Sequence, residues 1–205
     1  MNHDLYIFGS AVRGEVSPSS DIDVLVIPLC SPRGKYPNDW SVYSPEIIES
    51  YFHAGRLFAW HLYLEAKCIH FAGPTPYLST LGAPAPYSSV GKDIDDLEGM
   101  LRESLLEIQR QTSSLIYELG IAYTAIRDIA MAASWALMAR PCFSRNAPYL
   151  LPRPCPLPPE AYKGAMLARH TSTRGSDHDI ESGRIAEALL TAPLFPWVGD
   201  IRNAI

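Results

Sequence analysis

The sequence predicts an α+β protein in which a small β-sheet with helices precedes an all-α helical bundle. Two short apolar segments, residues 5–8 and 22–27, flank turn residues near the N-terminus. A long segment without proline, residues 87–140, carries apolar residues at helical spacing. Between these regions lies a stretch rich in proline and glycine, which are hostile to helix interiors. We therefore expect a first domain over residues 1–72, a linker over 73–91 and a helical bundle domain over 92–205.

The first two predicted strands carry the most informative residues of the chain. The apolar run Tyr6–Phe8 opens onto Gly9 and Ser10, and a later apolar strand begins with Asp21 and Asp23. Successive strand residues point to opposite faces, so the two carboxylates share one face of that strand. Like charges held side by side repel each other, and a hard divalent cation with oxygen ligands is the usual compensation. The pair therefore predicts a Mg²⁺ site.

The Gly-Ser turn suits a phosphate. A glycine lets the backbone approach a ligand closely, and the Ser10 hydroxyl and the amides near it can donate hydrogen bonds to phosphate oxygens. Without a ligand, the same residues would form a tight turn followed by a strand with two solvated acids. The coincidence of the turn with Asp21 and Asp23 favours the phosphate interpretation over this structural alternative.

Four features coincide here and carry a resemblance to a known family. An apolar strand precedes Gly-Ser, Arg13-Gly14 follows it, a short loop comes next, and Ser20-Asp21-Ile22-Asp23 opens another apolar strand. On these residues the chain resembles the minimal nucleotidyltransferase branch of the DNA polymerase beta superfamily, over residues 5–72. The resemblance implies a small mixed sheet. It also implies nucleotide binding by Gly9, Ser10, Arg13 and Ser20, and catalytic metal binding by Asp21 and Asp23.

The resemblance further implies a reaction. A nucleoside monophosphate, expected to be AMP from ATP, would pass to a hydroxyl or phosphate acceptor with release of pyrophosphate. Mg²⁺, or Mn²⁺ in its place, would be held by Asp21 and Asp23. The acceptor could be a small molecule, a protein side chain or an RNA end. The alternative is a domain that keeps the fold without turnover, as a nucleotide-binding or antitoxin-like module of a toxin–antitoxin pair.

Members of this family commonly use a third carboxylate on a later strand, and two residues compete for that role. Asp39 opens a short predicted strand and is the first candidate, although it could equally be a solvated turn acid. Glu65 is the second candidate. Apolar spacing over Pro45–Ala66 predicts one helix, on which Glu65 would be a structural or surface acid. If Leu57–Phe71 formed a strand instead, Glu65 would share a face with His61.

The second half predicts a series of helices. Apolar residues recur at helical spacing on both sides of the polar break Thr112–Ser114, and a short loop between long helices implies antiparallel packing. A proline-dense connector follows this helix pair, and the apolar C-terminal segment is expected to dock on the bundle. The expected ranges are residues 94–108 and 115–137 for the helix pair, 148–159 for the connector, 159–170 and 183–192 for later helices, and 193–198 for the docking segment.

Cations gather in this helical half, although the formal net charge of the chain is −5. That charge argues against broad, sequence-independent nucleic-acid binding, which draws its affinity from Lys and Arg. Arg127, Arg145 and His170 are candidates for contacting an acceptor or a phosphate, and a buried, paired Arg127 is an equal alternative. Helical partners of small nucleotidyltransferases include HEPN ribonucleases, which use an Arg and a nearby His on one helix. No His follows Arg127 within reach, so we do not expect ribonuclease activity.

Composition predicts a soluble protein with a substantial core, since 47% of the 205 residues are hydrophobic. No run approaches the ~18 apolar residues that span a bilayer. The start Met1–Asp4 lacks the basic residues of a signal peptide, so we expect a cytoplasmic location and no membrane contact. Family members usually place a helix ahead of the first strand, which here begins near residue 5. The sheet edge left open could be covered by the C-terminal half, a second copy or a cognate protein.

Overall fold

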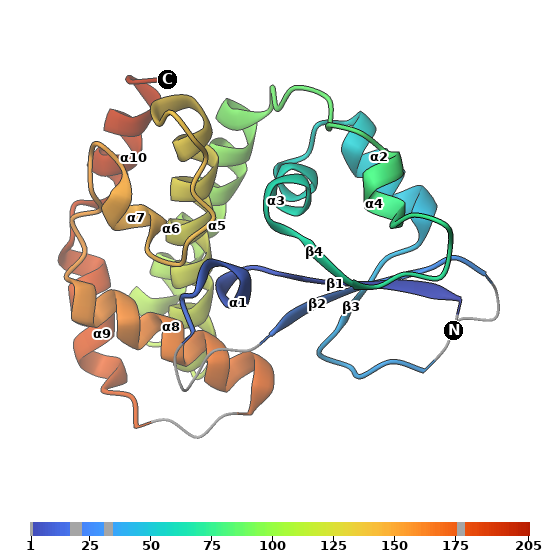
Figure 1. Cartoon of the computed structure of the whole chain (residues 1–205). Helices are drawn as coiled ribbons and strands as arrows, with labels where there is room; N and C mark the ends of the chain where they lie inside the picture. Colours follow the sequence, from blue (N-terminus) through green and yellow to red (C-terminus); the bar gives the residue numbers. More distant parts are fainter. Residues whose placement is uncertain (1, 17–21, 31–34, 176–178) are drawn as a thin grey trace. The chain divides into compact units, whose positions relative to one another are not determined.

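The computed structural model of the chain divides into two compact units, Met1–Ser89 and Val90–Ile205 (Figure 1). The structure describes residues 2–16, 22–30, 35–175 and 179–205. The first unit holds a sheet with helices and the second is helical. The predicted α+β fold class is therefore confirmed. Whether the two parts fold as independent domains stays a prediction.

The first unit is built on a mixed four-stranded sheet. Its elements in chain order are β1 (His3–Phe8), α1 (Ser10–Arg13), β2 (Asp23–Pro28), β3 (Ser41–Val42), α2 (Pro45–His53), α3 (Leu57–Glu65), β4 (Lys67–His70) and α4 (Tyr77–Thr80). The strand order is β3-β2-β1-β4. Strand β1 runs antiparallel to both β2 and β4, whereas β2 and β3 are parallel. The small mixed sheet implied by the resemblance is thus present.

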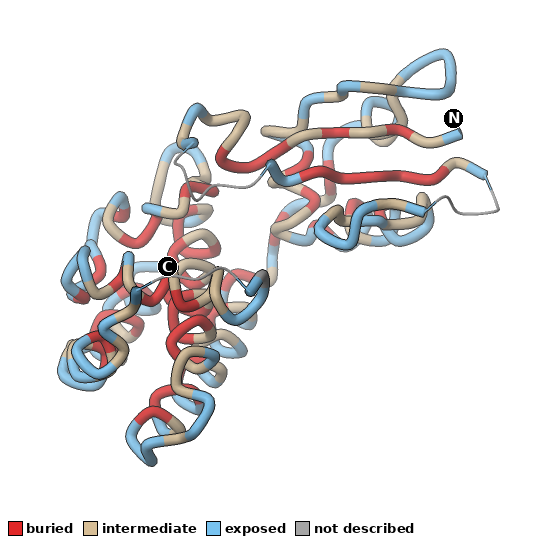
Figure 2. The backbone as a smooth tube through the Cα atoms, turned by 90° about the horizontal axis from the view of Figure 1, so that it is seen from below, coloured by how far each residue is buried: buried red, intermediate tan, exposed pale blue. Residues whose placement is uncertain are grey.

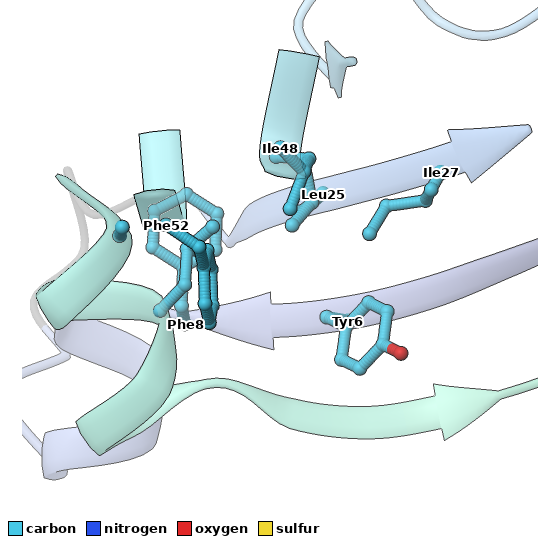
Figure 3. Close-up of a cluster of buried hydrophobic side chains, with 8 residues drawn as sticks. Tyr6, Phe8, Leu25, Ile27, Ile48 and Phe52 are labelled. Atoms are coloured by element: carbon cyan, nitrogen blue, oxygen red, sulfur yellow. The ribbon is translucent and has the colours of Figure 1, made fainter. Parts of the chain in front are cut away.

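The core of this unit lies between one sheet face and the helices α2 and α3. Strand β1 alternates, with Tyr6 and Phe8 buried and their neighbours half-buried, as expected for a strand with one packed face. Figure 3 shows these rings beside Leu25 and Ile27 of β2. The helices add Ile48, Phe52, Ala59 and Leu62 to the same cluster. Strand β2 is buried at every residue from Val24 to Pro28, as the continuous red stretch in Figure 2 shows.

The single helix predicted over Pro45–Ala66 is wrong, because two helices occupy this segment. The break is at Gly55, whose φ of 60° lies in the left-handed region that favours glycine. The next amide, that of Arg56, donates to the Tyr51 carbonyl at 3.0 Å. A Cβ atom at Gly55 would also stand 2.5 Å from the carbonyl oxygen of Ala85. Apolar spacing continues across the break, so spacing alone did not reveal it.

The segment after β4 folds back onto β1. The amides of Ala72 and Tyr77 donate to the Asp4 carboxylate at 3.0 and 2.6 Å, and the amide of Leu78 donates to the Tyr6 hydroxyl at 3.0 Å. Asp4 is fully buried, and the Tyr6 hydroxyl also donates to it at 3.1 Å. These non-local hydrogen bonds fasten residues 72–78, part of the expected linker, to the first unit.

The second unit is a helical bundle. Its elements are α5 (Val90–Gln109), α6 (Leu115–Leu137), α7 (Ala147–Leu150), α8 (Pro159–Arg174), α9 (Ser182–Thr191) and α10 (Leu194–Arg202). Helix α6 packs against α5, α7, α8 and α9. Close approach to α8 occurs at Gly120, where a Cβ atom would stand 2.8 Å from the Arg169 Cα. The predicted helix pair and the docking of the C-terminal segment are confirmed, the latter by burial of Trp197 and Val198.

One helix of this unit extends beyond its expected range. Helix α8 continues to Arg174, because Gly175 with a φ of 65° provides the left-handed position that ends it. The apolar C-terminal segment, expected only to dock on the bundle, forms the helix α10. Within the ranges the structure describes, no helix combines the length and the apolar character needed to cross a membrane.

Candidate functional site

The site begins at the sharp turn that follows β1. At Gly9 the backbone adopts φ 71° and ψ −145°, a conformation that side chains rarely allow. The chain then enters the one-turn helix α1, in which the amides of Val12 and Arg13 donate to the Gly9 carbonyl at 3.1 and 3.2 Å. A second left-handed residue, Gly14, ends that turn. The Gly-Ser segment is therefore a compact turn held between two glycines.

Asp23 lies directly against this turn. It is the first residue of β2 and pairs with Phe8 at the end of β1. A Cβ atom added to Gly9 would collide with Oδ2 of Asp23 and would stand 3.2 Å from its Cγ. The carboxylate thus occupies the space that a side chain at position 9 would fill. Because Asp23 is also exposed to solvent, the turn and an acidic oxygen meet at the surface of the unit.

Six residues are predicted to bind the nucleotide or the metal, and the structure brings three of them, Gly9, Ser10 and Asp23, together at this turn. Ser10 is buried beside it, with 8% of its surface exposed. Ser20 and Asp21 lie outside the described residues, so their predicted roles stay predictions. Arg13 lies at the end of α1, and its side chain is engaged with acids rather than left open.

Asp39 lies in an exposed turn ahead of β3 rather than in a strand. The predicted strand is shorter than expected, because only Ser41 and Val42 pair with β2. The pairing is parallel and sets Ser41 opposite Leu25. The chain before β3 consequently leads toward the end of β2 that carries Asp23. A role for Asp39 as third carboxylate stays a prediction.

Glu65 forms an ion-pair network with Arg13. It is the last residue of α3, so the helix interpretation of this position is correct and the strand alternative is wrong. The Arg13 Nη1 donates to Glu65 Oε2 at 2.5 Å, and the Arg13 Nε donates to Glu15 at 3.1 Å. His61, one helical turn before Glu65, lies 3.0 Å from the same oxygen. Two carboxylates therefore hold Arg13 beside the Gly-Ser turn.

The environment of Glu65 favours its charged form. Burial by itself raises the pKa of this carboxyl, but the hydrogen bond from His61 and the charge of Arg13 outweigh burial. The net pKa lies below its ordinary value of 4.5. His61 also packs edge-on against Phe8, with ring centroids 5.4 Å apart. The network thus links α3 to the end of β1 and to α1.

The sequence interpretation missed this network, although a signal was present. His61 and Glu65 are four residues apart, a spacing that brings side chains together on one helix face. Their joint contact with Arg13 is non-local and has no sequence signature. The sequence interpretation also missed Asp4, whose buried carboxylate holds the segment after β4. Asp4 lies inside a strand, and a strand pattern gives no sign of an acid paired with backbone amides.

The donor set at the turn suits a hard cation that carries a phosphate. A carboxylate oxygen of Asp23 lies next to Gly9, and the backbone amides of Ser10 and Ala11 follow at the start of α1. Among the described residues, no group of three or more His, Cys, Asp or Glu side chains lies together as a metal cluster. Asp21, the expected partner of Asp23, lies outside the described residues.

The candidates in the helical half belong to the second unit. Arg127 lies on α6, and its Nε donates to Asp128 at 2.7 Å. Arg127 is therefore paired through this nitrogen, as one of the two expectations for it states. Arg145 lies just before α7, and His170 lies on α8. The Arg145 Nη1 lies 3.9 Å from the Met166 Sδ of α8, and His170 is also engaged in a contact.

The start of the first unit matches a known protein family. Residues 2–36 match the family model described as nucleotidyltransferase domain. The matched segment contains β1, the Gly-Ser turn, α1 and β2, and so includes Gly9, Ser10 and Asp23. No curated protein matches the chain.

Proposed function

Because residues 2–36 carry a nucleotidyltransferase domain match, we propose that the chain is a metal-dependent nucleotidyltransferase. It moves a nucleoside monophosphate, AMP from ATP, onto a hydroxyl or phosphate acceptor and releases pyrophosphate. The single observation that supports this most is the position of the Asp23 carboxylate against the backbone of Gly9. That placement sets an acidic ligand for a cation beside a turn suited to phosphate.

In this proposal each residue of the turn has a task. Backbone amides after Gly9 and the Ser10 hydroxyl hold phosphate oxygens of the nucleotide, and Asp21 and Asp23 hold Mg²⁺. Bound Mg²⁺ neutralises charge on the triphosphate. An acceptor oxygen forms a bond to the α-phosphorus while the bond from that phosphorus to the bridging oxygen of pyrophosphate breaks. Asp39 is the candidate to take the acceptor proton, since it precedes β3 at the same end of the sheet.

Arg13 has a positioning task in the proposal. Its guanidinium is engaged by Glu15 and Glu65, so the residue cannot act as an unpaired cation. A guanidinium carries five N–H donors, and those not directed at the two acids remain able to meet a nucleotide phosphate. The predicted nucleotide contact of Arg13 therefore depends on Glu65 holding it in place.

The ion pairs of Arg13 with Glu15 and Glu65 are also the observation that favours a second candidate function. Two carboxylates beside one arginine lower the positive charge available for a triphosphate. A nucleotide-binding or antitoxin-like interaction module, without turnover, would tolerate that loss better than an enzyme. Its cognate protein or second copy would bind whether or not Asp21 and Asp23 carry charge.

The experiment that tests the proposal is incubation of the protein with labelled ATP, Mg²⁺ and cell extract. We expect label on an RNA, a protein or a small molecule with the wild type and none with Asp21→Asn/Asp23→Asn. The matched control is Glu103→Gln/Glu187→Gln, which removes the same charge from exposed helix positions of the second unit. Equal transfer by the Asp variant would contradict the proposed site.

A further inference from the structure

His61 joins the ion-pair network of Arg13 through a single carboxylate oxygen. Its Nε2 lies 3.0 Å from Oε2 of Glu65, and Nη1 of Arg13 lies 2.5 Å from the same atom. Glu65 is ionised at neutral pH, because its pKa lies below the ordinary value of 4.5. An ionised carboxylate only accepts hydrogen bonds, so the His61 Nε2 carries a hydrogen. A second proton on this ring would therefore be carried by Nδ1.

The three side chains of this network are largely withdrawn from water. The exposed fraction is 19% for Arg13 and 16% for both Glu65 and His61. Charges shielded from solvent interact more strongly than charges on an open surface. A change of charge at one member of the network therefore affects the other two.

The network lies next to the proposed phosphate site. Arg13 is the last residue of the one-turn helix α1, which begins directly after Gly9. The His61 ring packs edge-on against Phe8, the residue before Gly9. A nucleotide phosphate held at this turn would thus bring its negative charge close to the network.

The charged groups around His61 give the network a negative charge. Glu65 lies on the same helix, and Arg13 approaches from α1. Glu15, which follows α1, pairs with the Arg13 Nε at 3.1 Å, and Asp23 at the start of β2 adds a carboxylate beside the turn. One arginine and the two glutamates give the network a formal charge of −1 while the imidazole is neutral. Mg·ATP adds further net negative charge when it binds.

We propose that His61 takes up a proton when the nucleotide binds at the Gly-Ser turn, so that nucleotide binding is coupled to pH. Because a nucleotide occupies this turn under the proposed function, the inference rests on that function. Imidazole is the side chain that changes charge near neutral pH, and nearby anions favour its charged form. The proton passes from solvent to Nδ1 and brings the network to a formal charge of zero. His61 is thus a positioning residue, since it acts on the nucleotide through Glu65 and Arg13.

Calorimetric titration of the full chain with Mg²⁺ and α,β-methylene-ATP at pH 7 tests this proposal. The analogue cannot be cleaved between its α- and β-phosphorus atoms, so the heat reports binding alone. Titrations in PIPES and in Tris, which release a proton with a small and with a large enthalpy, together give the number of protons taken up. We expect wild type to take up more protons than His61→Gln, by up to one per nucleotide. The control His53→Gln changes an exposed histidine at the end of α2 and should match wild type.

The pH dependence of the affinity provides a second readout. As pH falls from 8 to 6, we expect wild type to gain affinity for the analogue relative to His61→Gln, by up to about tenfold per pH unit for one coupled proton. A merely structural role of His61 would lower the affinity of the variant by the same factor at every pH.

Nucleotide binding with equal proton uptake in wild type and His61→Gln would overturn this inference and leave the proposed function standing. Absence of nucleotide binding by wild type would contradict the proposed function itself, and this inference with it. If His61→Gln fails to fold by circular dichroism, NMR titration of the His61 imidazole in wild type decides. The midpoint of that titration should move to higher pH when the analogue is added, and an unchanged midpoint would overturn the inference.

Discussion

At Gly9 the backbone φ of 71° and the neighbouring Asp23 carboxylate together restrict the position to glycine. We predict that Gly9→Ala lowers the affinity for Mg·ATP by tenfold or more, about 1.4 kcal/mol, because the new Cβ displaces Asp23. The backbone at Gly9, with φ 71° and ψ −145°, would cost alanine about 1–3 kcal/mol of unfolding free energy in addition. Calorimetric titration and urea denaturation measure the two effects.

Gly14 offers a matched control for that change. It shares the positive φ, at 72°, although its ψ is 18° where that of Gly9 is −145°, and a Cβ atom there would meet nothing within 4 Å. Gly14→Ala should therefore show the loss of stability without the loss of nucleotide affinity. Equal nucleotide affinity in Gly9→Ala and wild type would show that the position of Asp23 beside the turn has no role in binding.

The Glu65 carboxylate provides a pH-dependent prediction. Its pKa is lowered in the folded state, so its contribution to stability is present above the ordinary value of 4.5 and is lost as pH falls through the lower folded value. At pH 7 we expect Glu65→Gln to reduce the free energy of unfolding by about 1–3 kcal/mol, since it removes hydrogen bonds between charged groups. The difference from wild type should shrink below pH 4.5 in urea denaturation.

An exposed ion pair serves as the comparison for Glu65. Glu107 of α5 pairs with Arg110, which directly follows that helix, and the two side chains are 42% and 70% exposed. Glu107→Gln should therefore change stability by less than about 1 kcal/mol at any pH. A Glu65→Gln effect as small as this, or one that persists at pH 3, would contradict the network with Arg13 and His61.

The proximity of the candidate site residues was predictable from sequence only where they belong to one local motif. Gly9, Ser10 and Asp23 stand in a motif whose spacing is visible along the chain, and the structure brings them together. The partnership of Arg13 with Glu65 joins residues 52 positions apart. No local pattern encodes such a distance, because the two residues meet only after α3 packs on the sheet.

Among the elements, β1 and the segment after β4 depend on one buried acid. Asp4→Asn keeps the side-chain size but replaces a carboxylate oxygen that accepts the Tyr77 amide. We expect a loss of about 1–3 kcal/mol in unfolding free energy, because a buried amide loses its acceptor. Hydrogen exchange of the Tyr77 and Leu78 amides should become faster than in wild type.

Asp39→Asn is the control for Asp4, since Asp39 is an exposed acid in a turn of the same unit. It should leave the exchange of both amides unchanged. Equal protection of Tyr77 and Leu78 in Asp4→Asn and wild type would mean that the Asp4 carboxylate does not hold this segment.

Element types followed from the spacing of apolar residues, and element boundaries did not. Helices α5 and α6 were predictable because long periodic runs flank a polar break. The division into α2 and α3 was missed because the apolar pattern continues across Gly55. Strand β4 was missed because its four residues follow α3 with one residue between them, too short a segment for a period of two to stand out.

At the scale of the whole molecule, each unit has its own buried core. Large buried side chains of the second unit include Ile94, Leu101, Leu119, Ile126 and Ile129, all within α5 and α6. We predict that residues 90–205, produced alone, fold into a helical protein that unfolds cooperatively in urea, because they hold a set of large buried side chains of their own. Circular dichroism measures both properties, and a non-cooperative transition would contradict this prediction.

The proline- and glycine-rich stretch, residues 73–91, contains the boundary between the two compact units. The sequence predicts a first domain ending at residue 72, whereas the first compact unit extends to Ser89. Hydrogen bonds from residues 72–78 to Asp4 and Tyr6 account for part of the difference. Proline and glycine indicate a segment without regular secondary structure, but such a segment can still belong to a compact unit.

The most direct test of the proposed nucleotidyltransferase is calorimetric titration of the four NTPs with Mg²⁺ into wild type and Asp21→Asn/Asp23→Asn. Our account predicts Mg²⁺-dependent binding, tightest for ATP, that disappears in the variant while its circular dichroism spectrum stays that of the folded protein. Nucleotide binding of equal affinity in the variant and the wild type would contradict the assignment of Asp23 and the Gly-Ser turn as the nucleotide site.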